Sequence, residues 1–245
     1  MTAPKVLVVL TSHTKLGDTG KPTGWYLSEF AHPYSVLSAA SVSLTVASPA
    51  GGHSAVDPSS IDAAKDDSIS TNFLNSESTK PLFESTRPLS EFVGNPSAIA
   101  PYSAIFFPGG HGPMFDLSIS PESQQLVREF WDAGKVVAAV CHGPAALANV
   151  KLSDGSLLLQ GRKVTGFTNA EEDQVGLSSA MPFLLEDKLR EAVGDEGKFE
   201  KAEQPWGEKV VVDAGGRLIT GQNPASAKGV GEAILRVITS PLEQH

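Results

Sequence analysis

A short apolar run leads directly into the single cysteine of this 245-residue chain. Residues 136–140 are small or β-branched throughout, which predicts a buried strand of a parallel sheet. Cys141-His142-Gly143-Pro144 interrupts the run, and the Ala-Ala-Leu-Ala after it predicts a helix. A tight turn from strand to helix raises one side chain above the end of the sheet, where open α/β sheets bind their ligands.

Two interpretations of Cys141 follow from this position. A thiol close to a helix N-terminus is favoured as the thiolate, and His142 beside it offers a second titratable group. The alternative is that Cys141 is a small apolar residue of the core. The residues elsewhere in the chain must show whether Cys141 is a nucleophile or a packing residue of the core.

The overall composition excludes several classes of protein. The net charge of −9 and the absence of a basic run argue against a nucleic-acid partner. One cysteine allows no internal disulfide, which fits a reducing compartment. The apolar N-terminal run, 6–10, is too short for a signal sequence or a membrane span. We therefore expect no membrane association and a cytoplasmic location, with the nucleus as an additional one.

The order of the predicted elements indicates one α/β domain over residues 1–245, a flavodoxin-like sandwich with a mostly parallel sheet and helices on both faces. The expected strands are 6–10, 44–47, 102–107, 136–140, 199–202, 210–213 and 217–220, with a hairpin or sheet edge within 157–164. The expected helices are 24–34 (kinked or ended by Pro33), 36–40, 89–93, 121–133, 182–193 and 226–238. The polar segment 54–90 is either a surface insertion or a cap over a site, and we favour the cap.

Glu29 is a candidate acid–base group in the first helix. Its neighbours are mostly apolar or aromatic, and no Lys or Arg lies within seven residues on either side. A carboxyl group in such surroundings is partly desolvated, which raises its pKa toward neutrality. The alternative is that Glu29 faces solvent on an amphipathic helix.

Two loops could complete a site around Cys141. The glycine-rich 109–112 loop directly follows a strand, so its N–H groups could stabilise an oxyanion; alternatively it binds nothing. The acidic triplet 171–173 could orient His142 as the third member of a triad, or form a solvated loop. The histidines lack the spacing of a zinc motif, and there is no phosphate-binding loop, so we expect neither a metal nor a cofactor.

Several motifs together resemble the ThiJ/PfpI superfamily, whose fold is similar to that of class I glutamine amidotransferases. They are Phe107-Pro-Gly-Gly-His-Gly112, Val140-Cys-His-Gly-Pro-Ala145, Val164-Thr-Gly-Phe-Thr168, Thr220-Gly-Gln-Asn-Pro-Ala-Ser226 and Glu29 in the first helix. Glu29-Phe-Ala-His-Pro and the long 54–90 segment resemble the branch of heat-inducible chaperones that are glyoxalase III enzymes. The residue after Cys141 is His142 and no Gly-x-Gln follows, which disfavours glutamine hydrolysis.

The resemblance implies a triad of Cys141, His142 and Glu172, with Glu171 as the alternative third member. It implies conversion of methylglyoxal, a small 2-oxoaldehyde, to lactate without glutathione, metal or cofactor. Glu29 would then move protons, the N–H groups of Gly110 and His142 would hold the oxyanion, and Trp206 would line the pocket. A homodimer is expected, with a monomer as the alternative. A holdase chaperone and a protein or nucleotide deglycase remain the rival functions.

Overall fold

The computed structural model describes residues 3–240, so the ends of the predicted 1–245 domain lie outside the described residues. The main sheet has seven strands in the order β3-β2-β1-β4-β5-β9-β8. These are β1 (Lys5–Val9), β2 (Ser43–Ser48), β3 (Arg87–Pro88), β4 (Ala104–Phe107), β5 (Val136–Val140), β8 (Val210–Asp213) and β9 (Leu218–Gly221). All neighbours pair in parallel except β8 and β9, which are antiparallel. The predicted mostly parallel sheet is confirmed.

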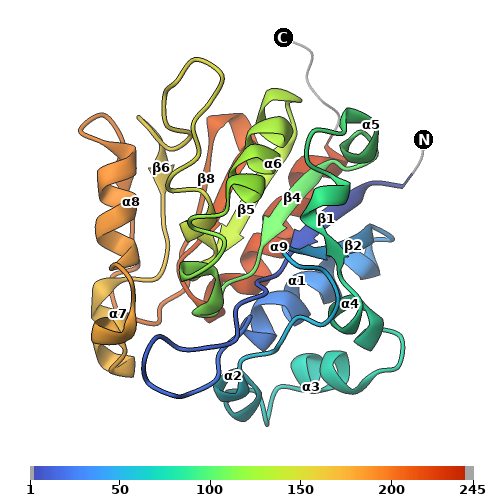
Figure 1. Cartoon of the computed structure of the whole chain (residues 1–245), viewed down its shortest axis with the longest axis vertical. Coiled ribbons are helices and arrows are strands. Elements are labelled where there is room, and N and C mark those ends of the chain that lie inside the picture. Colours follow the sequence, from blue (N-terminus) through green and yellow to red (C-terminus); the bar gives the residue numbers. More distant parts are fainter. Residues whose placement is uncertain (1–2, 241–245) are drawn as a thin grey trace.

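Helices cover both faces of this sheet (Figure 1). They are α1 (Leu27–Ala39), α2 (Pro58–Ala63), α3 (Ser68–Asn75), α4 (Lys80–Glu84), α5 (Pro96–Ile99), α6 (Pro121–Asp132), α7 (Asn169–Val175), α8 (Leu185–Val193) and α9 (Ala227–Thr239). Helices α1 and α9 pack against each other on one face, and α6 lies on the other. Every residue of β4 and β5 is buried, which explains why both strands are apolar runs without alternation.

The segment 54–90 folds into α2, α3, α4 and β3. Its apolar residues have a definite place to pack: Phe73 and Phe83 are buried against Trp25, and Phe73 also contacts Phe30. This aromatic cluster attaches the segment to the start of α1. The segment is thus anchored to the domain by its own core contacts.

Two helical predictions were wrong. Pro33 does not end the first helix and no separate helix begins at Val36, since α1 runs continuously from Leu27 to Ala39. Proline cannot donate the helical hydrogen bond to residue 29, but Pro33 is buried against Gly231 of α9, and this packing keeps the helix intact. The predicted helix after Cys141 is only a 3₁₀ turn, Gly143–Ala146, because glycine and proline at its start and close packing all around it override the helix propensity of the alanines.

The predictions for the 157–202 region also need correction. Strand pairing joins β6 (Lys163–Val164) to β7 (Lys198–Phe199) in a separate parallel ladder rather than a hairpin. The acidic triplet 171–173 does not lie in a loop, since α7 begins at Asn169 and includes it. Thr168 and Glu171 form a reciprocal capping box there, a Thr-x-x-Glu signal visible in the sequence. The acidic triplet is therefore held on a helix.

The contact between α1 and α9 depends on a residue without a side chain. A Cβ atom at Gly231 would lie 2.8 Å from the Cα of Pro33. We expect Gly231→Ala to force the helices apart and to destabilise the fold by about 1–3 kcal/mol, despite alanine's better helix propensity. Gly229→Ala is the control, because the nearest atom there belongs to the flexible Glu208 side chain. Urea denaturation measures both, and equal stability of the two variants would contradict the packing argument.

Candidate active site

Cys141 lies at a sharp turn at the carboxyl end of β5. Its backbone adopts φ 60°, a left-handed conformation that a residue with a side chain rarely adopts. The turn is fixed on both sides, because the Cys141 N–H donates to Gly221 and its carbonyl accepts from Phe167. The thiol is thereby held at the end of the sheet, as the sequence predicted.

The glycine loop after β4 approaches this turn closely. A Cβ at Gly109 would lie 2.6 Å from the backbone nitrogen of His142, and one at Gly110 would lie 2.5 Å from the Gly24 carbonyl oxygen. Gly110 has φ 90°, and its N–H interacts with the Cys141 sulfur. Glycine is therefore required for the backbone donors to reach the thiol.

Glu29 is fully buried beside Cys141, so the solvent-facing alternative is excluded. The Gly109 N–H donates to its Oε2 over 2.8 Å. Its Oε1 is buried without a hydrogen-bond partner of good geometry among the described residues. Burial raises the pKa of Glu29 to about 8, against the lowering effect of the bonds to Cys141 and Gly109. The carboxyl group can therefore gain or lose a proton near neutrality.

The expectation that Cys141 has a lowered pKa was wrong. Burial, and then the negative charge of Glu29, raise the pKa of Cys141 well above its ordinary value, although the Gly110 N–H opposes them. The α-helix that was expected to stabilise a thiolate is replaced by a 3₁₀ turn at residues 143–146. The thiol must consequently lose its proton to a neighbouring base as it reacts.

His142 and Glu172 extend in a chain of contacts from the Cys141 sulfur. His142 Nδ1 lies 3.4 Å from the Cys141 sulfur, and its Nε2 lies 2.6 Å from Glu172 Oε2. Burial would raise the pKa of Glu172, but hydrogen bonds from His111 and His142 outweigh it and lower the pKa to about 2. Burial and the nearby His111 lower the pKa of His142. A neutral imidazole thus lies between the thiol and a carboxylate.

Glu171, the alternative third member, points elsewhere. Its Oε2 caps α7 by accepting from the Thr168 N–H and hydroxyl. Its Oε1 accepts from the Trp206 N–H and from the side-chain amides of Gln222 and Asn223. The structure therefore brings Glu172, and not Glu171, to His142.

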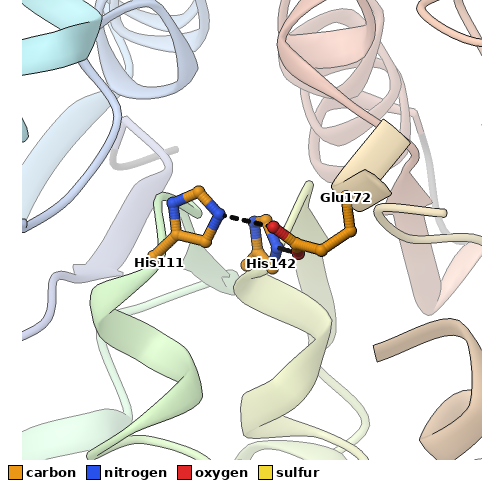
Figure 2. A group of neighbouring side chains, drawn as sticks. All are labelled: His111, His142 and Glu172. Carbon is orange, nitrogen blue, oxygen red and sulfur yellow. Dashed lines mark hydrogen bonds and ion pairs between the residues drawn. The ribbon is translucent and has the colours of Figure 1, made fainter. Parts of the chain in front are cut away.

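The sequence prediction missed His111. Its Nε2 lies 2.9 Å from Glu172 Oε1, and its ring centroid lies 4.4 Å from that of His142. Figure 2 shows both imidazoles directed toward the one carboxylate. His111 belongs to the glycine-rich loop that the sequence did single out, but nothing in the sequence placed it near Glu172.

A cavity of about 550 Å³ opens above the thiol. Its size is that of a pocket for a small organic ligand. Trp206 lines it, 42 % exposed, with its ring edge against Phe167, as the sequence predicted. The wall includes Tyr26, Asp57, Ser59, Asp62, Gly110, His111, Cys141, His142, Phe167, Val175, Leu177 and Trp206. Part of α2 thus lies at the cavity.

These features define an α/β protein with a buried cysteine at a strand-end turn, placed between a glutamate and a histidine–glutamate pair. The model of the DJ-1/PfpI family matches residues 23–237, and the chain belongs to this family. The predicted family is thus confirmed.

Individual relatives resemble nearly the whole chain. Glyoxalase 3 of Candida albicans is 32% identical in an alignment of 242 positions, which covers 94% of this chain and 97% of that protein. The structure of the Rapid Encystment Protein 24 KDa of Francisella tularensis superimposes with a TM-score of 0.87 at 35% identity, covering 97% of this chain and 100% of that one. The structure of glyoxalase III from Candida albicans superimposes with a TM-score of 0.78 at 30% identity, covering 95% of this chain and 96% of that one.

Within residues 3–240, no helix combines the length and apolar character that a membrane crossing requires.

Glu29 should make the stability of the protein depend on pH. Its pKa is raised from 4.5 to about 8 by folding, so the folded state binds more protons than the unfolded state between these values. The stability that protonated Glu29 contributes is complete below pH 4.5 and is lost as pH rises toward 8. Relative to Glu29→Gln, the free energy of unfolding of the wild type should fall by up to about 1.4 kcal/mol for each pH unit between these two values.

Urea denaturation of both proteins from pH 5 to pH 8 measures this difference. Glu122→Gln, an exposed change on α6, is the control and should follow the wild type. A constant difference between wild type and Glu29→Gln across the window would contradict the raised pKa.

Proposed function

We propose that this protein is a glutathione-independent glyoxalase, a lyase that converts methylglyoxal and water to lactate. The observation that carries the proposal is the position of the Cys141 sulfur. It lies beside the Glu29 carboxyl group and 3.4 Å from His142 Nδ1, at a cavity that admits a small carbonyl compound. The similarity to glyoxalase 3 of Candida albicans over nearly the full length supports the same reaction.

In the first step the sulfur adds to the aldehyde carbon, and the thiol proton leaves to a neighbouring base. Ionised Glu29 and the lone pair of His142 Nδ1 are both adjacent, so neither has to move to accept it. The carbonyl oxygen becomes an oxyanion, which the N–H groups of Gly110 and His142 stabilise until it is protonated. The product is a hemithioacetal on Cys141.

The second step moves hydrogen within the bound adduct. A base removes the proton from the former aldehyde carbon, giving an enediol, and a proton is then delivered to the adjacent carbon. Glu29 suits this exchange because its pKa of about 8 lets it accept and donate near neutral pH. The result is a lactoyl thioester with no net change in protons.

In the last step water adds to the thioester carbonyl, and the bond to sulfur breaks. The leaving sulfur regains a proton, and lactate departs. His142 removes a proton from the water, while Glu172, ionised and hydrogen-bonded to Nε2, keeps the imidazole in the tautomer whose Nδ1 accepts protons. One methylglyoxal and one water thus give one lactic acid, without a cofactor.

The proposal predicts lactate formation from methylglyoxal with no added thiol. Cys141→Ala should abolish turnover because it removes the nucleophile, and Glu29→Gln should reduce kcat by about 10²–10⁴-fold because it removes an acid–base group. Enzymatic determination of lactate measures both. Glu122→Gln should keep full activity.

Full activity of Cys141→Ala would contradict the mechanism, and full activity of Glu29→Gln would contradict its proton-transfer role. Aggregation assays with the same variants examine the rival holdase function. Suppression of aggregation by Cys141→Ala, combined with no lactate from the wild type, would favour a chaperone. Release of lactate from glycated peptide but not from free methylglyoxal would favour a deglycase.

We also propose that the segment 54–90 acts as a cap, because Ser59 and Asp62 of α2 line the cavity. Ser59→Trp should narrow the cavity and raise KM for methylglyoxal with little change in stability, since Ser59 is exposed. Ile61→Trp places the same bulk on α2 outside the cavity lining and should leave KM unchanged. Steady-state kinetics compares them, and equal KM values would contradict the cap.

A homodimer in the cytoplasm, and in the nucleus as well, completes the proposal. The absence of a helix suited to a membrane within residues 3–240 is compatible with that location. Sedimentation velocity tests the dimer, and imaging of a fluorescent fusion tests the location. A monomer in sedimentation, or a fusion confined to an organelle, would contradict the respective assignment.

A further inference from the structure

His111 has no task in the proposed reaction, yet it shares the carboxylate of Glu172 with His142. Glu172 accepts hydrogen bonds from the Nε2 atoms of both histidines, over 2.9 Å and 2.6 Å. The rings lie close together, with centroids 4.4 Å apart. One carboxylate serving two imidazoles exceeds what a single catalytic triad needs.

The same three side chains form a ligand set for a metal ion. One nitrogen from each histidine and one oxygen of Glu172 all lie within 4.8 Å of one another. Two imidazoles and one carboxylate are typical ligands of Zn²⁺ and of other divalent transition metals, with an open position for water. Figure 2 shows the three side chains converging from separate segments. No spacing rule along the chain could reveal such a set.

We propose that His111, His142 and Glu172 bind a divalent transition-metal ion such as Zn²⁺, and that this ion inhibits the enzyme. Binding of the ion does not require the glyoxalase reaction, whereas its inhibitory effect rests on the proposed function, in which His142 is a base. The cavity gives an ion access, since both histidines line it. Asp57 and Asp62 outnumber Lys21 at the cavity, and together with the net charge of −9 they favour the approach of a cation.

The geometry requires a small rearrangement. Ligand atoms bonded to one zinc ion at about 2.0–2.2 Å lie about 3.3 Å apart, so the two hydrogen bonds to Glu172 must open slightly and the imidazoles must draw together. His111 has room for this rotation because it is partly exposed at the cavity. The carboxylate of Glu172 already accepts a hydrogen bond from each imidazole, so both of its oxygens face the proposed ligand nitrogens.

Inhibition follows from the tautomer of His142. In the free protein, Nε2 carries the proton that Glu172 accepts, and Nδ1 is left as the acceptor facing the Cys141 sulfur. A metal ion on Nε2 requires the ring proton to lie on Nδ1. His142 can then donate toward the sulfur but can no longer accept its proton. Metal binding and the base function of His142 are therefore mutually exclusive.

Titration of the full-length protein with Co²⁺, followed by its visible ligand-field absorption, tests the site. The wild type should bind one ion, and His111→Ala should weaken binding at least tenfold because a ligand is lost. His111→Asn serves as a second variant of similar size, and thermal melts verify that both fold. Zn²⁺ should displace Co²⁺ from the wild type.

Two control variants distinguish this site from others. Cys141→Ala should bind Co²⁺ within about twofold of the wild type, because no thiolate ligand is proposed. His53→Ala removes an exposed histidine that contacts Glu84 and should also bind normally. Equal affinity of wild type and His111→Ala, or loss of binding in Cys141→Ala, would overturn the proposal. None of these results depends on methylglyoxal turnover, so a failure of the proposed function would be seen separately.

Discussion

The hydrogen bond from the Gly109 N–H to the Glu29 carboxyl group holds the reactive centre together. It joins the first turn of α1 to the loop that leaves β4, directly beside the thiol at the end of β5. Because Glu29 is fully buried, its pKa rises to about 8 despite this hydrogen bond. The close approach that allows this bond also requires a glycine at position 109, where a Cβ would lie 2.7 Å from the carboxyl oxygen. The absence of a side chain at residue 109 is therefore a condition both for the packing of the loop and for the hydrogen bond to the Glu29 carboxyl group.

Cys141 lies between two arms of different chemistry. On one side is a buried carboxyl group whose charge is unfavourable, and on the other a neutral imidazole supported by a carboxylate of pKa about 2. The first arm exchanges protons easily near neutrality, and the second keeps a fixed tautomer. This difference arises from partners rather than from residue type, because Glu29 and Glu172 are both buried.

The sequence was sufficient for the main features of the fold and for the thiol, because they depend on local patterns. The sequence alone identifies uniformly apolar strands such as β5. It also shows that the single cysteine directly follows one of them. The apolar neighbours of Glu29 made it a candidate acid–base group, but they left a solvent-facing position open, and its role followed from the family resemblance. The choice between Glu171 and Glu172 was not predictable from the residues alone, since it depends on which face of α7 meets His142. His111 was missed because its partner lies 61 residues away in sequence, and Pro33 because its tolerance depends on α9.

Two consecutive glutamates on α7 connect this short helix by hydrogen bonds to two different parts of the site. Glu171 holds the backbone of Trp206 and the side chains of Gln222 and Asn223, which shape one wall of the cavity. Glu172, the next residue, sets the imidazole beside the thiol. Any substitution that reshapes the Trp206 wall through Glu171 will also shift the support of His142. The shape of the cavity wall at Trp206 and the orientation of His142 are consequently linked through two adjacent residues of one short helix.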